Sequence, residues 1–433
     1  MNNSSGWVAS IVLFIFSSLL VSCGVSAQET ASQPVTLMIT GDPAERDAYI
    51  ELVNAFETAH PEVDVEITHI PSGSAYRDRI ATDFAAGSPP DVTLWNYRRY
   101  AGFAAEGLFE PLGPYLDESD MIAREDFFPI AIQSFTWQGE LMCIPQNISS
   151  LVVYYNRDLF DAAGVPYPAN DWTWDDFVET AKALTLDLDN DGVVDQYGLG
   201  TEISLYRLAP FVWQNGGVIV DDTASPNRLT LTRPPSLEAL QWFVDLRQVH
   251  GVLPDRVEEQ AMDSESRFVA GMTAMFLNSR VGTPSYREIE SFTWNVAPLP
   301  TGKTAAGVLH SDAYCMSSAA KDKEAAWTFI EFANSFEGQS IIARSGRTVP
   351  SLISVAESEV FLDPTQLPAN SRIWVDTASV LQTVPVISTW QEIESATNEE
   401  LERAVYGEIS AEEAANLAFT RTEEYFKLGV KAK

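Results

Sequence analysis

Residues 187–195 have the types and spacing of ligands for a hard cation. The ligand atoms would come from Asp187, Asp189, Asp191, the backbone carbonyl of Val193, and Asp195. With Gly192 at the sixth position, the pattern copies the first part of an EF-hand calcium loop. The twelfth position holds Gly198 where that loop has a bidentate Glu, so Glu202 or another segment would have to complete the site. The pattern predicts either a structural calcium or a plain solvated acidic turn.

The thiol of Cys23 is a second group with a chemistry of its own. It follows Leu20-Val21-Ser22, precedes Gly24 and ends an uncharged apolar run of signal-peptide length, a pattern that resembles the bacterial lipobox. We therefore expect residues 1–22 to be a lipoprotein signal peptide, Cys23 to carry a lipid anchor, and residues 23–34 to form a flexible tether. The alternative is cleavage after Val25-Ser26-Ala27 by an ordinary signal peptidase, which would release a secreted protein.

The composition narrows the range of partners. The chain has 61 acidic against 27 basic side chains, a net charge of -34. This charge argues against nucleic acid, because binding to phosphates requires basic residues. The 433 residues are 45% hydrophobic and 20% charged, as in an ordinary soluble protein large enough for two lobes. We expect a monomer whose only contact with a membrane is the lipid anchor.

The remaining cysteines and the histidines carry little signal. Cys143 and Cys315 either pair, which an exported compartment permits, or remain as two buried thiols. The four His include no close pair that would indicate a zinc site.

The first part of the chain alternates strand and helix patterns, which predicts a parallel α/β sheet. Strands are expected at 35–40, 63–67 and 91–95, with helices at 44–58 and 76–86. Ligands of such sheets bind beyond the carboxyl ends of the strands. This rule points to Asp42 after the first strand and to Trp95 and Asn96 after the third.

The pattern restarts after residue 150. We expect strands at 151–155 and 292–296, helices at 157–163, 236–249 and 321–336, a short helix feeding a strand within 268–276, and helices in the last forty residues. Thr173 and Asp176 form a variant of the capping box at the start of a further helix.

Several motifs, in this order, resemble extracellular solute-binding proteins of carbohydrate ABC importers, the maltose-binding-protein-like group. They are Pro145–Gly164, Thr173–Phe177, Val269–Met275, Ala297–Pro300, Ala325–Ile330 and Ser345–Ser351. Each motif is weak alone, and their order over nearly the whole mature chain makes the resemblance specific.

The resemblance implies an α/β fold of the two-lobe periplasmic-binding-protein type (type II), with hinge crossover strands and a ligand cleft between the lobes. The N-terminal lobe would comprise residues 35–145 plus 310–350, and the C-terminal lobe residues 146–309 plus 351–433. Cys143 and Cys315 would lie on the two segments where the chain crosses between lobes. We therefore advance the hypothesis that a disulfide there restrains the hinge.

A sugar ligand presents apolar faces that suit aromatic rings and hydroxyls that suit polar side chains. The candidate ligand-binding residues are Asp42, Trp95, Asn96, Asn147, Trp213, Asn278, Asp312, Arg347 and Trp390. By family position, Asp42, Asn96 and Asp312 come from the first lobe and Asn278 from the second. For the tryptophans the alternative is packing, and for the polar residues it is capping of their own backbone.

We interpret the chain as a receptor that captures a carbohydrate outside the membrane and presents it to an ABC permease, with no cofactor required. The alternatives are a secreted glycosidase, a binding protein for a sensor, and a receptor for a non-sugar solute. No Gly-x-Ser-x-Gly elbow, zinc helix motif or phosphate-binding Gly loop is present in the sequence. With 61 acids, the presence of carboxylate pairs says nothing about glycosidase activity.

Overall fold

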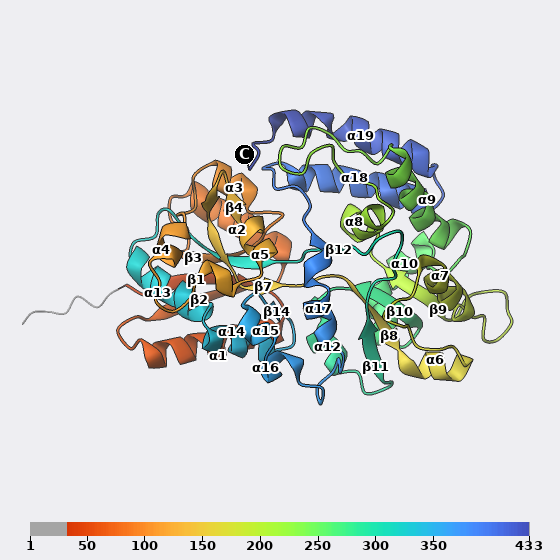
Figure 1. Cartoon of the computed structure of the whole chain (residues 1–433), viewed down its shortest axis with the longest axis horizontal. Coiled ribbons are helices and arrows are strands. Elements are labelled where there is room, and N and C mark those ends of the chain that lie inside the picture. The colour runs from red at the N-terminus through yellow and green to blue at the C-terminus, as the bar shows by residue number, and fades with distance from the viewer. Residues whose placement is uncertain (1–32, 433) are drawn as a thin grey trace, which may run out of the picture. The chain divides into compact units, whose positions relative to one another are not determined.

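Two β-sheets organise the chain, and each forms the centre of one lobe (Figure 1). The computed structural model describes residues 33–432. Residues 34–433 form one compact unit. We call the part built on the five-stranded sheet the first lobe and the part built on the four-stranded sheet the second lobe.

The first sheet has the strand order β2-β1-β3-β13-β6. Its strands are β1 (Val35–Thr40), β2 (Val65–Ile70), β3 (Val92–Asn96), β13 (Asp312–Met316) and β6 (Cys143–Pro145). β1 is parallel to β2 and β3, whereas β13 is antiparallel to both β3 and β6. The three strands predicted from the alternating pattern, β1, β2 and β3, are parallel as expected, and the antiparallel β13 makes the complete sheet mixed.

The second sheet has the order β11-β8-β10-β9. Its strands are β8 (Val152–Asn156), β9 (Tyr197–Thr201), β10 (Thr273–Asn278) and β11 (Trp294–Ala297). β9 and β10 are parallel, so their carboxyl ends meet at one edge, and β8 is antiparallel to both of its neighbours, β10 and β11. The strand residues are buried almost throughout, as expected for a sheet covered on both faces.

The helices follow the same division. The segments that supply the first sheet also supply α1 (Pro43–Ala59), α2 (Gly73–Ala85), α3 (Ala101–Ala105), α4 (Gly113–Asp117), η1 (Arg124–Asp126), α5 (Pro129–Ser134), α13 (Lys323–Ala333) and α14 (Phe336–Arg344). The segments around the second sheet supply α6 (Arg157–Ala163), α7 (Trp174–Ala183), α8 (Leu205–Gln214), α9 (Pro234–Gln248), α10 (Arg256–Ala261), α11 (Ser264–Val269), η2 (Arg280–Gly282) and α12 (Thr283–Arg287). The C-terminal part adds α15 (Ile353–Ala356), α16 (Glu359–Leu362), α17 (Arg372–Asp376), η3 (Ala378–Val380), α18 (Trp390–Val405) and α19 (Ala411–Leu428).

Local sequence explains several helix ends. Asp42 caps α1 by accepting from the Glu45 amide, and Pro43 occupies the first turn, where its missing N–H costs nothing. The predicted capping box of Thr173 and Asp176 is confirmed at the start of α7. The single helix predicted for 321–336 was wrong at its end. α13 stops at Ala333, and Ser335 caps a new helix, α14.

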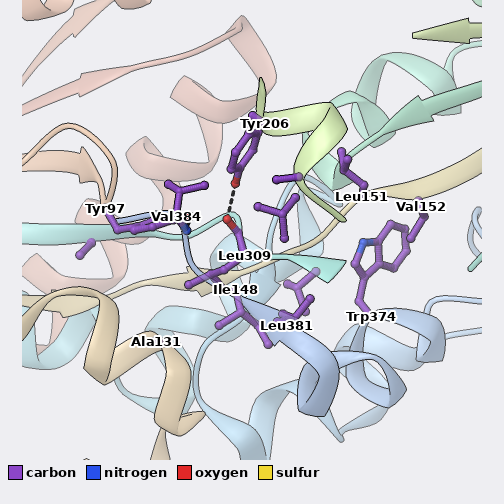
Figure 2. Close-up of a cluster of buried hydrophobic side chains, with 14 of the residues drawn as sticks. Tyr97, Ala131, Ile148, Leu151, Val152, Tyr206, Leu309, Trp374, Leu381 and Val384 are labelled. Atoms are coloured by element: carbon purple, nitrogen blue, oxygen red, sulfur yellow. Dashed lines mark hydrogen bonds between the residues drawn. The ribbon is translucent and has the colours of Figure 1, made fainter. Parts of the chain in front are cut away.

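Short strand pairs hold the segments that cross between the lobes. β7 (Asn147–Ile148) pairs with β14 (Val349–Pro350), and β12 (Gly307–Val308) pairs with β15 (Leu381–Gln382). A separate hairpin of β4 (Thr136–Trp137) and β5 (Glu140–Leu141) precedes the first crossing. Figure 2 shows the buried cluster formed here by crossing-segment residues such as Ile148, Leu309 and Val384, with Tyr206 of α8 and Trp374 of α17 beside them. The residue limits predicted for the two lobes stay a prediction.

Candidate functional site

Three of the predicted polar residues form one hydrogen-bonded cluster in the first lobe. Asn96 ends β3, and Asp312 begins β13 directly opposite it. The two Asp312 oxygens accept from Asn96 Nδ2 at 3.0 Å and from Asn147 Nδ2 at 3.3 Å. Each amide therefore fixes one carboxylate oxygen, and the remaining lone pairs of Asp312 can accept from a ligand hydroxyl.

Asn96 and Asp312 of this cluster line a cavity of about 140 Å³, which we call the first half-site. Its lining is Thr40, Glu45, Tyr49, Gly73, Tyr76, Arg77, Leu94, Trp95, Asn96, Arg99, Gln146, Asp312 and Arg347. Most of these residues follow the carboxyl ends of β1 and β3 or lie on neighbouring helices, where ligands of α/β sheets bind. The half-site therefore offers both donors and acceptors for a ligand with several hydroxyl groups.

Arg347 forms ion pairs with Asp42 and Glu45 at the first half-site. Asp42 caps α1 with one carboxylate oxygen and accepts from Arg347 Nη1 at 3.1 Å with the other, so it serves its own backbone and the site together. Arg347 Nε lies 2.7 Å from Glu45 Oε2. Burial raises the pKa of Glu45 to about 7, although Arg347 opposes the shift. Glu45 thus titrates near neutral pH inside the site.

Sequence reasoning missed Glu45 because it occupies the third helical position, where an acidic residue usually completes a capping box. Here its carboxyl group folds back over Gly41. A Cβ atom at Gly41, whose φ is 132°, would lie 1.5 Å from Glu45 Oε2. The absence of a side chain at residue 41 is the signal that could have revealed this arrangement.

The three candidate tryptophans are buried. Trp95, Trp213 and Trp390 are 3%, 6% and 1% exposed. The Trp95 ring packs 4.4 Å from the ring of Phe103, and its Nε1 donates to Thr93 Oγ1. Trp95 lines the first half-site, whereas the burial of Trp213 and Trp390 favours packing, the alternative that the sequence left open.

A larger cavity of about 520 Å³ lies at the carboxyl ends of β9 and β10, and we call it the second half-site. Its lining is Thr201, Glu202, Ile203, Arg207, Arg256, Glu259, Gln260, Asp263, Ser264, Glu265, Phe276, Asn278, Asn398, Glu402 and Tyr406. The predicted Asn278 accepts from Arg207 Nη2 at 3.2 Å and donates to the Tyr286 hydroxyl at 2.7 Å. The buried Nε of Arg207 has no hydrogen-bond partner within residues 33–432, so it is a free donor beside this cavity.

A pair of arginines was also missed. Arg98 and Arg99 follow β3, and both bind the Glu394 carboxylate of α18 at 2.5 Å. Arg98 also lies 3.7 Å from the centre of the Tyr206 ring, and the Tyr206 hydroxyl donates to the Leu309 carbonyl (Figure 2). Two adjacent basic residues after a strand, in a chain with only 27 Lys and Arg, were a usable signal. No sequence signal pointed to Glu394, which lies on a helix far away in the sequence.

His310 lies at the base of this region, in a crossing segment. It is half-buried, its Nε2 atom is buried, and its ring lies 4.5 Å from the ring of Tyr206. Burial, together with the nearby charges of Arg207 and Arg98, holds its pKa well below the usual value. His310 is therefore neutral at physiological pH and adds no charge to the site.

In the structure, Cys143 and Cys315 form a disulfide. The two cysteines face each other on β6 and β13, neighbouring strands of the first sheet. The bond lies within one sheet and does not span the lobes, and its effect on the hinge stays a prediction. It fastens the two crossing segments to each other on the first-lobe side.

The acidic turn lies between α7 and β9 in the second lobe. Carboxylate oxygens of Asp187, Asp189 and Asp195 lie within 4.8 Å of one another, a spacing that fits one hard cation. The Asp191 carboxylate accepts from the Val193 amide and is not part of this group. Three of the predicted ligands are thus brought together, and calcium binding stays a prediction.

A two-lobed α/β fold with polar half-sites at the strand ends of both lobes defines the class of solute-binding proteins. The family model of the bacterial extracellular solute-binding protein matches residues 41–340. The chain belongs to this family.

Solved structures share the fold. An ABC substrate-binding protein of Listeria monocytogenes, in complex with cycloalternan, has a TM-score of 0.82 at 24% identity and covers 90% of this chain and 98% of its own. A maltose-bound MalE3 of T. maritima has a TM-score of 0.76 at 22% identity and covers 91% and 99%.

Curated relatives match over most of their length. A maltooligosaccharide ABC transporter solute-binding lipoprotein of Streptococcus pneumoniae is 23% identical, over 95% of each chain. A galactooligosaccharide-binding protein of Bacillus subtilis is 22% identical, over 84% of this chain and 89% of its own.

Cys23 and the predicted signal peptide lie outside the described residues. Within the part of the chain that the structure describes, no helix has the length and apolar character needed to cross a membrane.

Proposed function

We propose that this protein captures a sugar or oligosaccharide outside the cytoplasmic membrane and delivers it, chemically unchanged, to an ABC importer. The relatives named for maltooligosaccharide and galactooligosaccharide binding support this substrate class. The observation that carries the proposal is the Asn96–Asp312–Asn147 cluster, since fixed amide and carboxylate groups suit the paired donors and acceptors of sugar hydroxyls.

The test is calorimetric titration of the mature protein with a panel of neutral mono- and oligosaccharides. We expect at least one sugar to bind with a Kd near 1 µM, or about -8 kcal/mol, and to raise the unfolding temperature. Chromatography of the same mixtures should show no hydrolysis. Binding of peptides or polyamines without any sugar would contradict the proposed substrate class, and sugar cleavage would favour a glycosidase.

We further propose that the protein is anchored through Cys23. The lipobox-like residues 20–23 support this anchor, as does the word lipoprotein in the name of the streptococcal relative. Replacing Cys23 with Ala should move the protein from the membrane fraction to the medium or periplasm. An unchanged membrane fraction would leave the acyl anchor without support.

A further inference from the structure

A buried ion cluster joins the two lobes. Arg98 and Arg99 belong to the first lobe, immediately after β3. Glu394 belongs to α18, which packs on α8, α9 and α19 of the second lobe. The Glu394 residue is only 3% exposed, and each of its carboxylate oxygens lies 2.5 Å from one guanidinium. Such short, charge-assisted contacts between lobes bias the equilibrium between open and closed arrangements.

The cluster lies between the two half-sites. Arg99 lines the first half-site, while Asn398 and Glu402 line the second. Glu394, Asn398 and Glu402 are spaced four residues apart on α18, so they share one face of the helix. The contact of Glu394 with Arg99 therefore connects a residue that lines the first half-site to the helix that lines the second.

The surrounding contacts connect the cluster to both the ligand groups and the crossing segments. Asn96 donates to Asp312 and accepts from Arg98 Nε at 3.3 Å, so the first half-site and the ion cluster share one amide. Arg98 covers the Tyr206 ring, and the Tyr206 hydroxyl donates to a crossing segment. The Arg99 Nη1 atom is buried without a hydrogen-bond partner in the described residues, which leaves one donor available to an incoming acceptor.

We propose that Glu394, Arg98 and Arg99 form an autoinhibitory clasp that holds the lobes together without ligand and that a ligand spanning both half-sites must open. The proposal rests on the proposed function, since it describes how that same site is regulated. Only open molecules bind the ligand, so the apparent Kd equals the Kd of the open form divided by the fraction of molecules that are open. Hydroxyl groups of the ligand then take the place of Glu394 on the guanidinium donors.

The test is small-angle X-ray scattering of the ligand-free protein. Glu394→Gln should raise the radius of gyration relative to wild type, because the second lobe loses its charge contact with the first. Glu400→Gln is the matched control: Glu400 is also 3% exposed on α18 and bound by two arginines, Arg403 and Arg421, but all three lie on α18 and α19. The control should leave the radius of gyration unchanged.

If Glu394→Gln does not fold, judged by circular dichroism, the triple variant R98Q/R99Q/E394Q removes all three charges and leaves no buried ion unpaired. An increase in its radius of gyration supports the clasp. Identical scattering of wild type and either folded variant overturns it. Because no sugar is present, this result is independent of the sugar panel, and failure of the panel alone would leave the clasp standing while removing the proposed substrate class.

Discussion

The two half-sites differ in how firmly their polar groups are held. In the first, Asp312, Asn96 and Asn147 bind one another before any ligand arrives. In the second, the acidic groups face solvent, and the Glu202 side chain is 64% exposed. Fixed groups are already oriented for the ligand, whereas exposed side chains lose conformational freedom when they bind. From this comparison we expect the first half-site to contribute more to ligand affinity than the second.

The lobes also differ in covalent bracing, and removing it should give the largest effect on stability. The disulfide joins residues 172 positions apart, within the first sheet. We expect Cys143→Ser with Cys315→Ser to lower the free energy of unfolding by about 2–5 kcal/mol. Urea denaturation monitored by tryptophan fluorescence measures this loss. An unchanged midpoint would show that packing alone holds the first sheet.

A substitution in the first half-site should weaken ligand binding more than a substitution in the second. Asp312→Ala leaves the side-chain amides of Asn96 and the buried Asn147 without their acceptor, so we expect the sugar Kd to rise about 100-fold. Glu202→Gln, at an exposed position, should change the Kd by less than about threefold. Calorimetric titration with the sugar found in the panel gives both values, and melting curves show whether each variant is folded. Equal losses in the two variants would remove the distinction between the half-sites.

The first half-site should also respond to pH. Burial raises the pKa of Glu45 from 4.5 to about 7, so this carboxyl group favours folding in its protonated form. Its contribution is complete below pH 4.5 and is lost as the pH rises through 7, which destabilises the wild type at pH 8. The free energy of unfolding of Glu45→Gln, relative to that of the wild type, should therefore be about 1–3 kcal/mol higher at pH 8 than at pH 5. Urea denaturation of both proteins at the two pH values measures this change. The same difference in free energy of unfolding between variant and wild type at both pH values would contradict the assignment.

The smallest expected effect is in the second lobe. If the acidic turn binds calcium, millimolar calcium should raise the unfolding temperature by about 2 °C. Asp187→Asn should abolish the shift, because it removes one of the three clustered carboxylates. The control is magnesium at the same concentration, which suits this flexible loop less well. An unchanged unfolding temperature of the wild type in calcium would show that the motif is a solvated acidic turn.

Sequence patterns predicted the regular elements well where local signals are strong. Arg157–Ala163 was predicted at both ends, because Asn156 caps its start and Gly164, at a φ of 65°, ends it. The strand predicted at 63–67 is found at Val65–Ile70, since its register follows pairing with β1 across the sheet. The antiparallel entry of β13 also depends on long-range pairing, which local periodicity does not encode.

The site was predictable to the extent that it follows strand ends. Asn96 lies at the carboxyl end of β3, where the rule for α/β sheets places ligands, whereas Asp312 begins β13 and was predicted from the family resemblance. Glu45 and Glu394 escaped because their roles depend on where a helix is packed, and Glu45 also has a local reading as a capping residue. The aromatic candidates were least informative, since a tryptophan beside a turn in sequence is buried as readily as one in the middle of a helix.

Two buried carboxylates on α18 show how this helix has to behave when the lobes separate. Glu400 is fastened to α18 and α19, and Glu394, six residues earlier, is fastened to the opposite lobe. At 1.5 Å per residue these attachments are about 9 Å apart. The helix thus acts as a stiff arm, and separation of the lobes would break its contact at Glu394 while the contacts of Glu400, about 1.7 turns away, stay within α18 and α19.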